Sequence, residues 1–288
     1  MSHGPRRPTL ARKTPHTEHD VTVHGMRIRY VDVGERDAPT LLLIHGHTSR
    51  IEEYDDLVPH LARGHRVIVP DLPGSGYSDK PTDRPYTLRF YEDTLLGLLD
   101  TLKVREAHIG GGSLGGNLTL RLGHREAERF PRLAAWAPAG AWKPLKAVSE
   151  VGKALGRAAG RALFWPFVWV QSRFWYEASW PHRDRTLKET FAYYREVMGP
   201  GFARMYFELG FDQMAHSHFP YANAIKQPTL LAWGDRDHAL GMGEGVKALS
   251  KLIPRAELTV FKGAKHSLAN EVPAELGALV SGFLRRPA

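Results

Sequence analysis

The sequence predicts an α/β protein with a mostly parallel central sheet, helices on both faces of that sheet, and an inserted helical cap. Short continuous apolar runs alternate with amphipathic segments of helical spacing along most of the 288 residues. Apolar runs of this kind are typical of strands buried on both faces. Their alternation with helices is typical of a parallel sheet. This alternation of strand-like and helix-like segments stops over residues 138–226, which are helix-like and rich in aromatic side chains.

The first half of the chain begins with alternating apolar and polar residues at 21–23 and 26–33, around Gly25, as in a β-hairpin. Thr87 is a plausible N-cap for a later amphipathic segment. In chain order we expect a strand at 40–44, a helix at 51–61, a strand at 66–70 and a helix at 87–102.

The second half repeats the same alternation on either side of the aromatic segment. We expect a strand around Ile109, a helix from Leu114 to about Arg129, strands at 133–137, 229–233 and 258–261, and helices at 243–252 and 271–284. The chain then divides into a mobile basic extension (1–19), an α/β core (20–137 and 227–288) and a helical cap (138–226).

The composition limits the possible partners. The formal charge is +8, and part of the excess lies in the first nineteen residues (Arg6, Arg7, Arg12 and Lys13). The remaining basic residues are scattered among acids and form no nucleic-acid motif, which favours a solvated basic surface and no nucleic-acid partner. The chain has no cysteine, so disulfides, thiolate catalysis and zinc-finger sites are excluded.

No apolar run approaches the ~20 residues that span a bilayer, so no integral membrane segment is predicted. Residues 1–19 are polar and basic and do not resemble a signal peptide. We therefore expect a cytoplasmic monomer or homodimer. Because no metal-ligand spacing or dinucleotide fingerprint is present, we also expect no metal and no cofactor.

The most informative stretch is residues 107–117, where an apolar run ends in glycines around Ser113 and a helical pattern opens at Leu114. Gly111 and Gly115 flank the serine in a Gly-x-Ser-x-Gly frame. A serine on a sharp strand-to-helix turn is strained, and glycines at these two positions remove the collisions of such a turn. The hydroxyl would stand at a helix N-terminus, where free amides favour a developing negative charge.

Alone this motif is weak, since it arises by chance in a chain of this length with a probability on the order of 0.1. Two later segments add to it, Gly234-Asp-Arg-Asp237 and Gly263-Ala-Lys-His266. In order and spacing the three segments resemble the serine hydrolases of the α/β-hydrolase fold. The resemblance implies a nucleophile elbow at Ser113, a catalytic base at His266 and an acid at Asp237. Asp235 is then expected to cap backbone amides of a turn.

The same resemblance implies an oxyanion hole made by the backbone N–H groups of His47 and Leu114. His45 matches the histidine that braces this loop in the family, and residues 71–78 match a signature that shapes the loop beside the site. Gly112, Thr48 and His238 depart from the common residues at their positions, which leaves the narrow subfamily open. The role of the His47 side chain also stays open.

These residues predict a carboxylic-ester hydrolase that works through an acyl-enzyme on a small-molecule ester with an apolar acyl or alcohol group. A serine at the elbow argues against dehalogenases and epoxide hydrolases, which have aspartate there. The alternatives are a carbon–carbon bond hydrolase of β-diketone or ring-cleavage products, an acyltransferase, and a hydrolase-fold ligand receptor with slow turnover. Ser267 follows His266 where carbon–carbon hydrolases often have tryptophan.

Specificity is expected to come from the cap, in which a subset of the aromatic side chains would line the pocket. The candidates are Phe164, Trp165, Phe167, Trp169, Phe174, Trp175, Trp180, Tyr193, Tyr194, Tyr206, Phe207 and Phe211.

Overall fold

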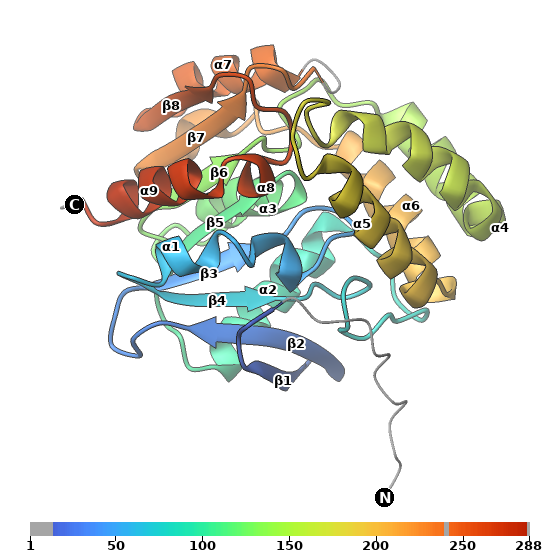
Figure 1. Cartoon of the computed structure of the whole chain (residues 1–288), viewed down its shortest axis with the longest axis horizontal. Helices are drawn as coiled ribbons and strands as arrows, with labels where there is room; N and C mark the ends of the chain where they lie inside the picture. The colour runs from blue at the N-terminus through green and yellow to red at the C-terminus, as the bar shows by residue number, and fades with distance from the viewer. Residues whose placement is uncertain (1–13, 239–241, 287–288) are drawn as a thin grey trace, which may run out of the picture.

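The computed structural model describes residues 14–238 and 242–286. Within them the chain forms one eight-stranded sheet in the order β1-β2-β4-β3-β5-β6-β7-β8 (Figure 1). β1 and β4 each pair with β2 in antiparallel fashion, and the other pairs are parallel, which confirms the predicted fold class. The strands are β1 (Glu18–Val23), β2 (Met26–Val33), β3 (Thr40–Ile44), β4 (Arg66–Pro70), β5 (His108–Gly112), β6 (Leu133–Trp136), β7 (Thr229–Gly234) and β8 (Ala256–Phe261).

Helices cover both faces of this sheet because alternate residues of each buried strand enter different cores. Leu42 and Ile44 of β3 belong to the core beneath α2, α3 and α7, whereas Leu41 and Leu43 belong to the core beneath α1 and α9. The α-helices are α1 (Val58–Leu61), α2 (Leu88–Thr101), α3 (Leu114–Arg125), α4 (Lys146–Gln171), α5 (Arg183–Val197), α6 (Pro200–Met214), α7 (Met242–Leu252), α8 (Leu268–Glu271) and α9 (Pro273–Leu284). Three 3₁₀ turns lie at η1 (Ile51–Tyr54), η2 (Ser172–Phe174) and η3 (Ala222–Ala224).

Proline divides two segments that the spacing predicted to be single helices. The expected helix at 51–61 is η1 followed by α1, because Pro59 lacks the N–H that a continuous helix would need there. The expected helix at 271–284 is α8 followed by α9, with Pro273 at the first position of α9. The helix after Ser113 ends at Arg125, earlier than the predicted Arg129.

The N-terminal boundary was predicted too late in the chain. β1 begins at Glu18, so residues 18 and 19 pair with β2 and do not belong to an extension. Arg29, which is fully buried, explains this: its Nε donates to Glu18 Oε2 at 2.8 Å, and it also pairs with Glu52 and Asp71 at 2.8 Å each. Residues 1–13 of the expected extension lie outside the described residues.

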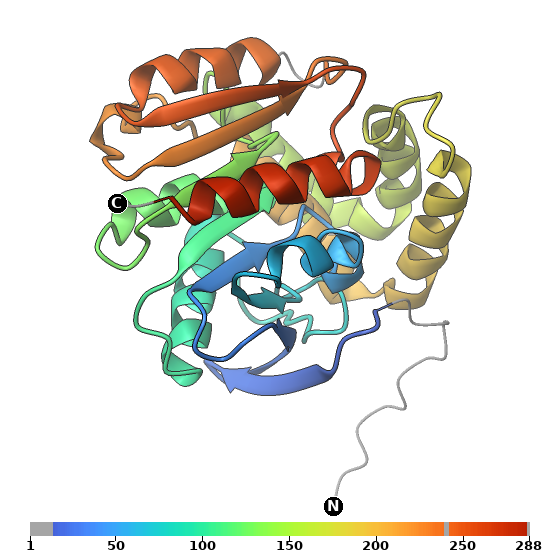
Figure 2. The ribbon, with the colours of Figure 1, turned by 60° about the vertical axis from the view of Figure 1, so that its left-hand side comes forward.

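α4, α5 and α6 lie between β6 and β7 in the chain and stand together at one end of the sheet (Figures 1 and 2). We call them the helical insertion. α4 approaches α6 closely through a row of three glycines. A Cβ on Gly152 would lie 2.2 Å from the Phe211 ring, and one on Gly156 would lie 2.2 Å from Cβ of Phe207. No helix in the described part of the chain is long and apolar enough to cross a membrane.

Candidate active site

Ser113 occupies a strained corner between β5 and α3, with φ +54° and ψ −114°. The glycines beside it are required by the end of β3, which passes at close range. A Cβ on Gly115 would lie 1.8 Å from the Ile44 carbonyl oxygen, and one on Gly111 would lie 2.3 Å from the same oxygen. Side chains at positions 111 and 115 would therefore collide with the end of β3, which is a steric reason for glycine at both positions.

Gly112, which departs from the common family residue, is fixed by Trp136 at the end of β6. A Cβ on Gly112 would lie 2.3 Å from Nε1 of that indole. Tyr54 packs edge-on against Trp136, with 5.8 Å between ring centroids, and its hydroxyl accepts from the Gly112 N–H at 3.1 Å and donates to the Ile44 carbonyl at 2.8 Å. Two buried aromatic side chains thus hold the strand that carries Ser113.

Asp237 and His266 lie in the loops after β7 and β8, and because β5 to β8 run parallel, both loops open at the edge where Ser113 stands. His266 Nδ1 donates to Asp237 Oδ2 at 2.7 Å. Asp237 is 2% exposed. Burial alone would lower the pKa of His266, but the charge and hydrogen bond of Asp237, together with the charges of Glu53 and Glu271, raise it above its ordinary value.

Asp235, the other aspartate of this loop, has a different environment. It is exposed, and its Oδ1 accepts from the Gly263 N–H at 2.7 Å. The geometry therefore favours Asp237 over Asp235 as the partner of the histidine.

Ser113 and His266 lie where two cavities meet. One cavity, of about 840 Å³, opens toward η1 and α5 and is lined by many polar side chains. The other, of about 600 Å³, is mostly apolar and lies against α4 and α6. Both are lined by Ser113, His266 and His47 and by Gln171 and Trp175. Six residues from the predicted aromatic set line the apolar cavity: Phe167, Phe174, Trp175, Tyr206, Phe207 and Phe211.

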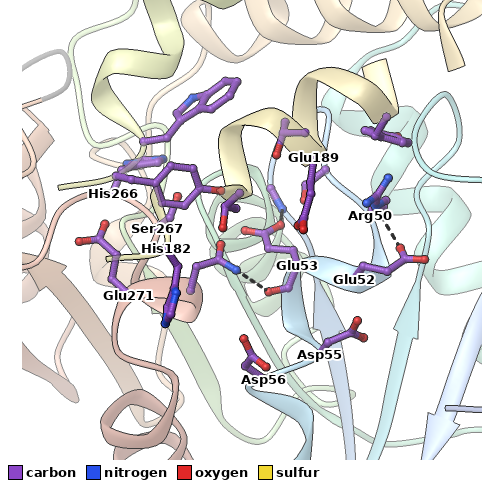
Figure 3. A pocket seen from close by; sticks show the side chains of 18 of the residues that line it. Arg50, Glu52, Glu53, Asp55, Asp56, His182, Glu189, His266, Ser267 and Glu271 are labelled. Atoms are coloured by element: carbon purple, nitrogen blue, oxygen red, sulfur yellow. Dashed lines mark hydrogen bonds and ion pairs between the residues drawn. The ribbon is translucent and has the colours of Figure 1, made fainter. Parts of the chain in front are cut away.

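Carboxylates outnumber arginines in the lining of the polar cavity. Six line it (Glu52, Glu53, Asp55, Asp56, Glu189 and Glu271) against two arginines (Arg50 and Arg185). Figure 3 shows Glu53 in the middle of this view, between His266 and Arg50. Burial raises the pKa of Asp55 to about 7 and that of Glu271 to about 7. Near neutral pH those two groups are therefore only partly ionised, and the negative charge of the lining comes mainly from the other four carboxyl groups; we call this the acidic cavity.

Glu53 is a carboxylate of this lining that lies near the elbow. Its Oε2 accepts from the Gly46 N–H at 2.9 Å. A Cβ placed on Gly46 would lie 3.6 Å from both carboxylate oxygens and 3.7 Å from Cβ of Ser113, so Glu53 and Ser113 face the same point of the backbone. Nothing in the sequence indicates this placement, because neither the spacing nor the chemistry of residues 51–54 distinguishes Glu53 from its neighbours.

The loop after β3 is held by His45. The His45 Nε2 accepts from the Leu72 N–H at 3.0 Å, so Nδ1 carries the proton and donates to the Gly46 carbonyl at 2.7 Å. Within the described residues, the backbone N–H groups of His47 and Leu114 donate to no other group. Both amides are available to a ligand beside Ser113.

The side chains of the same loop contact the helical insertion. The His47 ring stacks on Tyr206 at 5.3 Å between centroids, and burial lowers the pKa of His47 to about 4. Thr48 has φ +62°, which a proline could not adopt, and its Oγ1 accepts from the Tyr194 hydroxyl at 2.9 Å. The absence of the common family proline at this position follows from that backbone conformation.

Residues 14–238 and 242–286 contain no group of three or more histidine, aspartate or glutamate side chains arranged to hold a metal ion. The chemistry that these residues can support is proton transfer at His266 and nucleophilic attack by Ser113.

The chain belongs to the α/β-hydrolase fold family, whose model matches residues 39–271. It is 26% identical over 293 residues to a 2-hydroxymuconate semialdehyde hydrolase of Pseudomonas sp. (strain CF600), covering 94% of this chain and 95% of that one. It is 42% identical over 112 residues to a haloalkane dehalogenase of Psychrobacter cryohalolentis, covering 38% of this chain and 37% of that one. The enol-lactonase of Burkholderia xenovorans LB400 superposes with a TM-score of 0.78 at 24% identity, covering 93% of this chain and all of that one. The protein is a hydrolase of this family.

Proposed function

We propose that this protein is a serine hydrolase that cleaves carboxylic esters through an acyl-enzyme, with Ser113 as nucleophile, His266 as general base and acid, and Asp237 as the acid that orients it. The observation that carries the proposal is the buried bond of 2.7 Å between Asp237 and His266, beside a serine strained at φ +54° that lines the same two cavities. Because the elbow residue is a serine, an ester-type acyl transfer is favoured over dehalogenation.

In the proposed mechanism Asp237 accepts a hydrogen bond from the Nδ1–H of His266, which leaves Nε2 unprotonated and able to take the proton of the Ser113 hydroxyl. Attack on the substrate carbonyl produces an oxyanion, which accepts hydrogen bonds from the backbone N–H groups of His47 and Leu114. The Leu114 amide begins α3, so the helix N-terminus adds a favourable field. His266 then protonates the leaving alcohol. In the second half of the reaction His266 takes a proton from water, which attacks the acyl-enzyme, and returns that proton to Ser113 as the carboxylic acid leaves.

The two cavities divide the substrate between them. α4 and α6 would act as a cap whose aromatic side chains bind an apolar acyl or alcohol group in the cavity of about 600 Å³. The acidic cavity takes the other half of the substrate and disfavours an anionic group there, since Glu53 and the neighbouring carboxylates would repel it.

The test is steady-state hydrolysis of p-nitrophenyl esters from acetate to palmitate, with Ser113→Ala as the control. We expect sustained turnover that is lost in the variant, and a preference for acyl chains that fill the apolar cavity. Turnover that survives in Ser113→Ala, or a single burst without cycling, would remove the esterase proposal. A single burst would favour a slow receptor.

Carbon–carbon bond hydrolysis is the second candidate, because the similarity to the 2-hydroxymuconate semialdehyde hydrolase extends over 94% of this chain. The acidic cavity argues against it, since a substrate of the muconate kind is an anion. Comparing kcat/KM for p-nitrophenyl butyrate with kcat/KM for a dienoate ring-cleavage product separates the two candidates. A higher value for the dienoate would make the carbon–carbon reaction the principal activity.

A further inference from the structure

Part of the solvent-exposed side of α4 is apolar, whereas the glycines of the same helix pack closely against α6. Its exposed apolar side chains follow the helical spacing of three and four residues that places them on one side. They are Leu145 (48% exposed), Val148 (49%), Val151 (61%) and Leu155 (51%). Figure 1 shows α4 at the outer edge of the molecule, far from the sheet.

A second group of exposed apolar side chains lies C-terminal to the non-helical Ala159, at the rim of the apolar cavity. Phe167, Val170 and Phe174 are 45%, 50% and 43% exposed, and the same three side chains line that cavity. Trp169 lies between them in the chain, is 56% exposed, and carries the Arg173 guanidinium 3.9 Å above its ring. The mouth of the cavity beside Ser113 therefore opens on an apolar surface.

Basic residues accompany the apolar ones. Residues 143–173 contain six lysines and arginines and one acid, Glu150, which pairs with Lys153. The other five basic side chains are exposed: Lys143, Lys146, Arg157, Arg161 and Arg173. This combination of an apolar stripe and basic residues is typical of helices that lie in the interface of an anionic membrane.

We propose that the surface formed by these exposed apolar and basic residues of 143–174, which we call the α4 face, docks on a lipid bilayer that contains anionic phospholipid. The positive charge of the face complements such a bilayer. A second copy of this chain fits it less well, because a two-fold contact would place the two rows of basic residues against each other. Although α4 is 26 residues long, no helix in the described part of the chain is both long and apolar enough to span a membrane, so α4 would lie on the surface.

Docking through the α4 face would place the mouth of the apolar cavity at the membrane. With the α4 face on the bilayer, the rim formed by Phe167, Val170 and Phe174 opens toward the acyl chains, so an apolar molecule could enter the cavity without crossing water. The docking surface does not depend on the reaction proposed above, and binding can be measured without turnover.

Vesicle co-sedimentation of the whole chain carrying Ser113→Ala tests the proposal. Vesicles of phosphatidylcholine alone are compared with vesicles that also contain phosphatidylglycerol, at low and high salt. We expect binding to the anionic vesicles that weakens in salt. Lys146→Glu with Arg157→Glu is expected to weaken binding at least tenfold, since each basic residue contributes about fivefold. Val151→Ser with Leu155→Ser is expected to weaken it as well.

The chain offers matched controls outside the α4 face. Leu252 and Val260 are each 43% exposed, and Arg105 and Lys262 are exposed basic residues. Leu252→Ser with Val260→Ser, and Arg105→Glu with Lys262→Glu, are expected to bind vesicles like the parent chain. Thermal melting of each variant confirms that it is folded.

Three results would overturn the proposal. The first is an absence of binding to anionic vesicles. The second is an equal loss of binding in the control and α4 variants. The third is a dimer, measured by light scattering, that Val151→Ser with Leu155→Ser converts to monomer, since that result would make the α4 face an interface between copies of this chain.

Discussion

Replacing Asp237 by asparagine tests the proposed role of the pair that it forms with His266. The carboxylate accepts a hydrogen bond from His266 Nδ1, with 2.7 Å between Nδ1 and Oδ2. Asp237 is 2% exposed, so bulk water cannot take the place of the carboxylate. An asparagine has nearly the same volume but presents an N–H₂ group or a neutral oxygen. The histidine would then favour the tautomer that leaves Nε2 protonated and unable to accept the Ser113 proton.

The expected magnitude follows from this geometry. Loss of the correct tautomer and of the charge that stabilises the imidazolium lowers kcat by about 10³ to 10⁴ in serine triads, which corresponds to about 4–5.5 kcal/mol of transition-state stabilisation. The volume and the burial are kept, so we expect the melting temperature to fall by only a few degrees, as for a single buried hydrogen bond.

The assay is kcat and kcat/KM for p-nitrophenyl butyrate across pH, in the parent chain, Asp237→Asn and Asp235→Asn. Only neutral His266 can act as a base, so activity falls as the pH drops below its pKa. Without the charge of Asp237 that pKa falls, and the residual acidic limb of Asp237→Asn is expected at lower pH. Asp235→Asn removes the charge but keeps an oxygen that can accept from the Gly263 N–H, and it is expected to retain most of the activity. A larger loss in Asp235→Asn than in Asp237→Asn would refute the assignment.

Three further variants test the surroundings of the site. Gly112→Ala puts a methyl group 2.3 Å from Nε1 of Trp136, so the free energy of unfolding measured in urea should fall by about 1–3 kcal/mol. For Gly282→Ala in α9, where a Cβ meets nothing within 4 Å, the free energy of unfolding should rise by up to about 1 kcal/mol. An equal effect at both positions would contradict the packing argument. Glu18→Gln removes a charged partner of the buried Arg29 and should cost about 1–3 kcal/mol, against less than about 1 kcal/mol for Asp20→Asn, whose partner Arg27 is 42% exposed. Glu53→Gln removes a charge that raises the pKa of His266, so the acidic limb of kcat/KM should move to lower pH, and an unmoved limb would show that Glu53 does not act on His266.

The parts of the fold that the sequence predicted are those with local causes. Strands buried on both faces need continuous apolar runs. The turn at Ser113 needs glycines because a Cβ at either flanking position would lie within 2.3 Å of the Ile44 carbonyl oxygen at the end of β3. The partner of His266 was chosen by the position of Asp237 after Gly234, and the geometry favours that choice. The start of β1 was missed because Glu18 is held by Arg29, a contact that no local pattern marks.

The parts that it did not predict depend on residues brought together from distant segments. Gly112 differs from the common family residue because Trp136 on a neighbouring strand takes the space of a side chain, and Tyr54, which packs against Trp136, also binds the Gly112 N–H. The two cavities form where the helical insertion meets the loops around Ser113: residues of α4 and α6 line the apolar cavity, and residues of η1 and α5 line the other. Which aromatic side chains line them depends on how these helices pack and not on the helical period, so the sequence could name only the whole set.

The acidic cavity has unequal effects on the two charges that the proposed reaction creates. When Ser113 attacks, an oxyanion and an imidazolium form together and the site gains no net charge. The Glu53 carboxylate opposes the first and favours the second, so its effects on kcat largely cancel. Protonation of His266 in the free enzyme and binding of an anionic substrate do change the net charge, and there the carboxylate acts in full. Glu53→Gln should therefore change the pH profile and the discrimination against esters of anionic alcohols much more than the plateau kcat. A large fall in plateau kcat with both other properties unchanged would contradict this account, because Glu53→Gln removes the charge but keeps an oxygen that can accept from the Gly46 N–H.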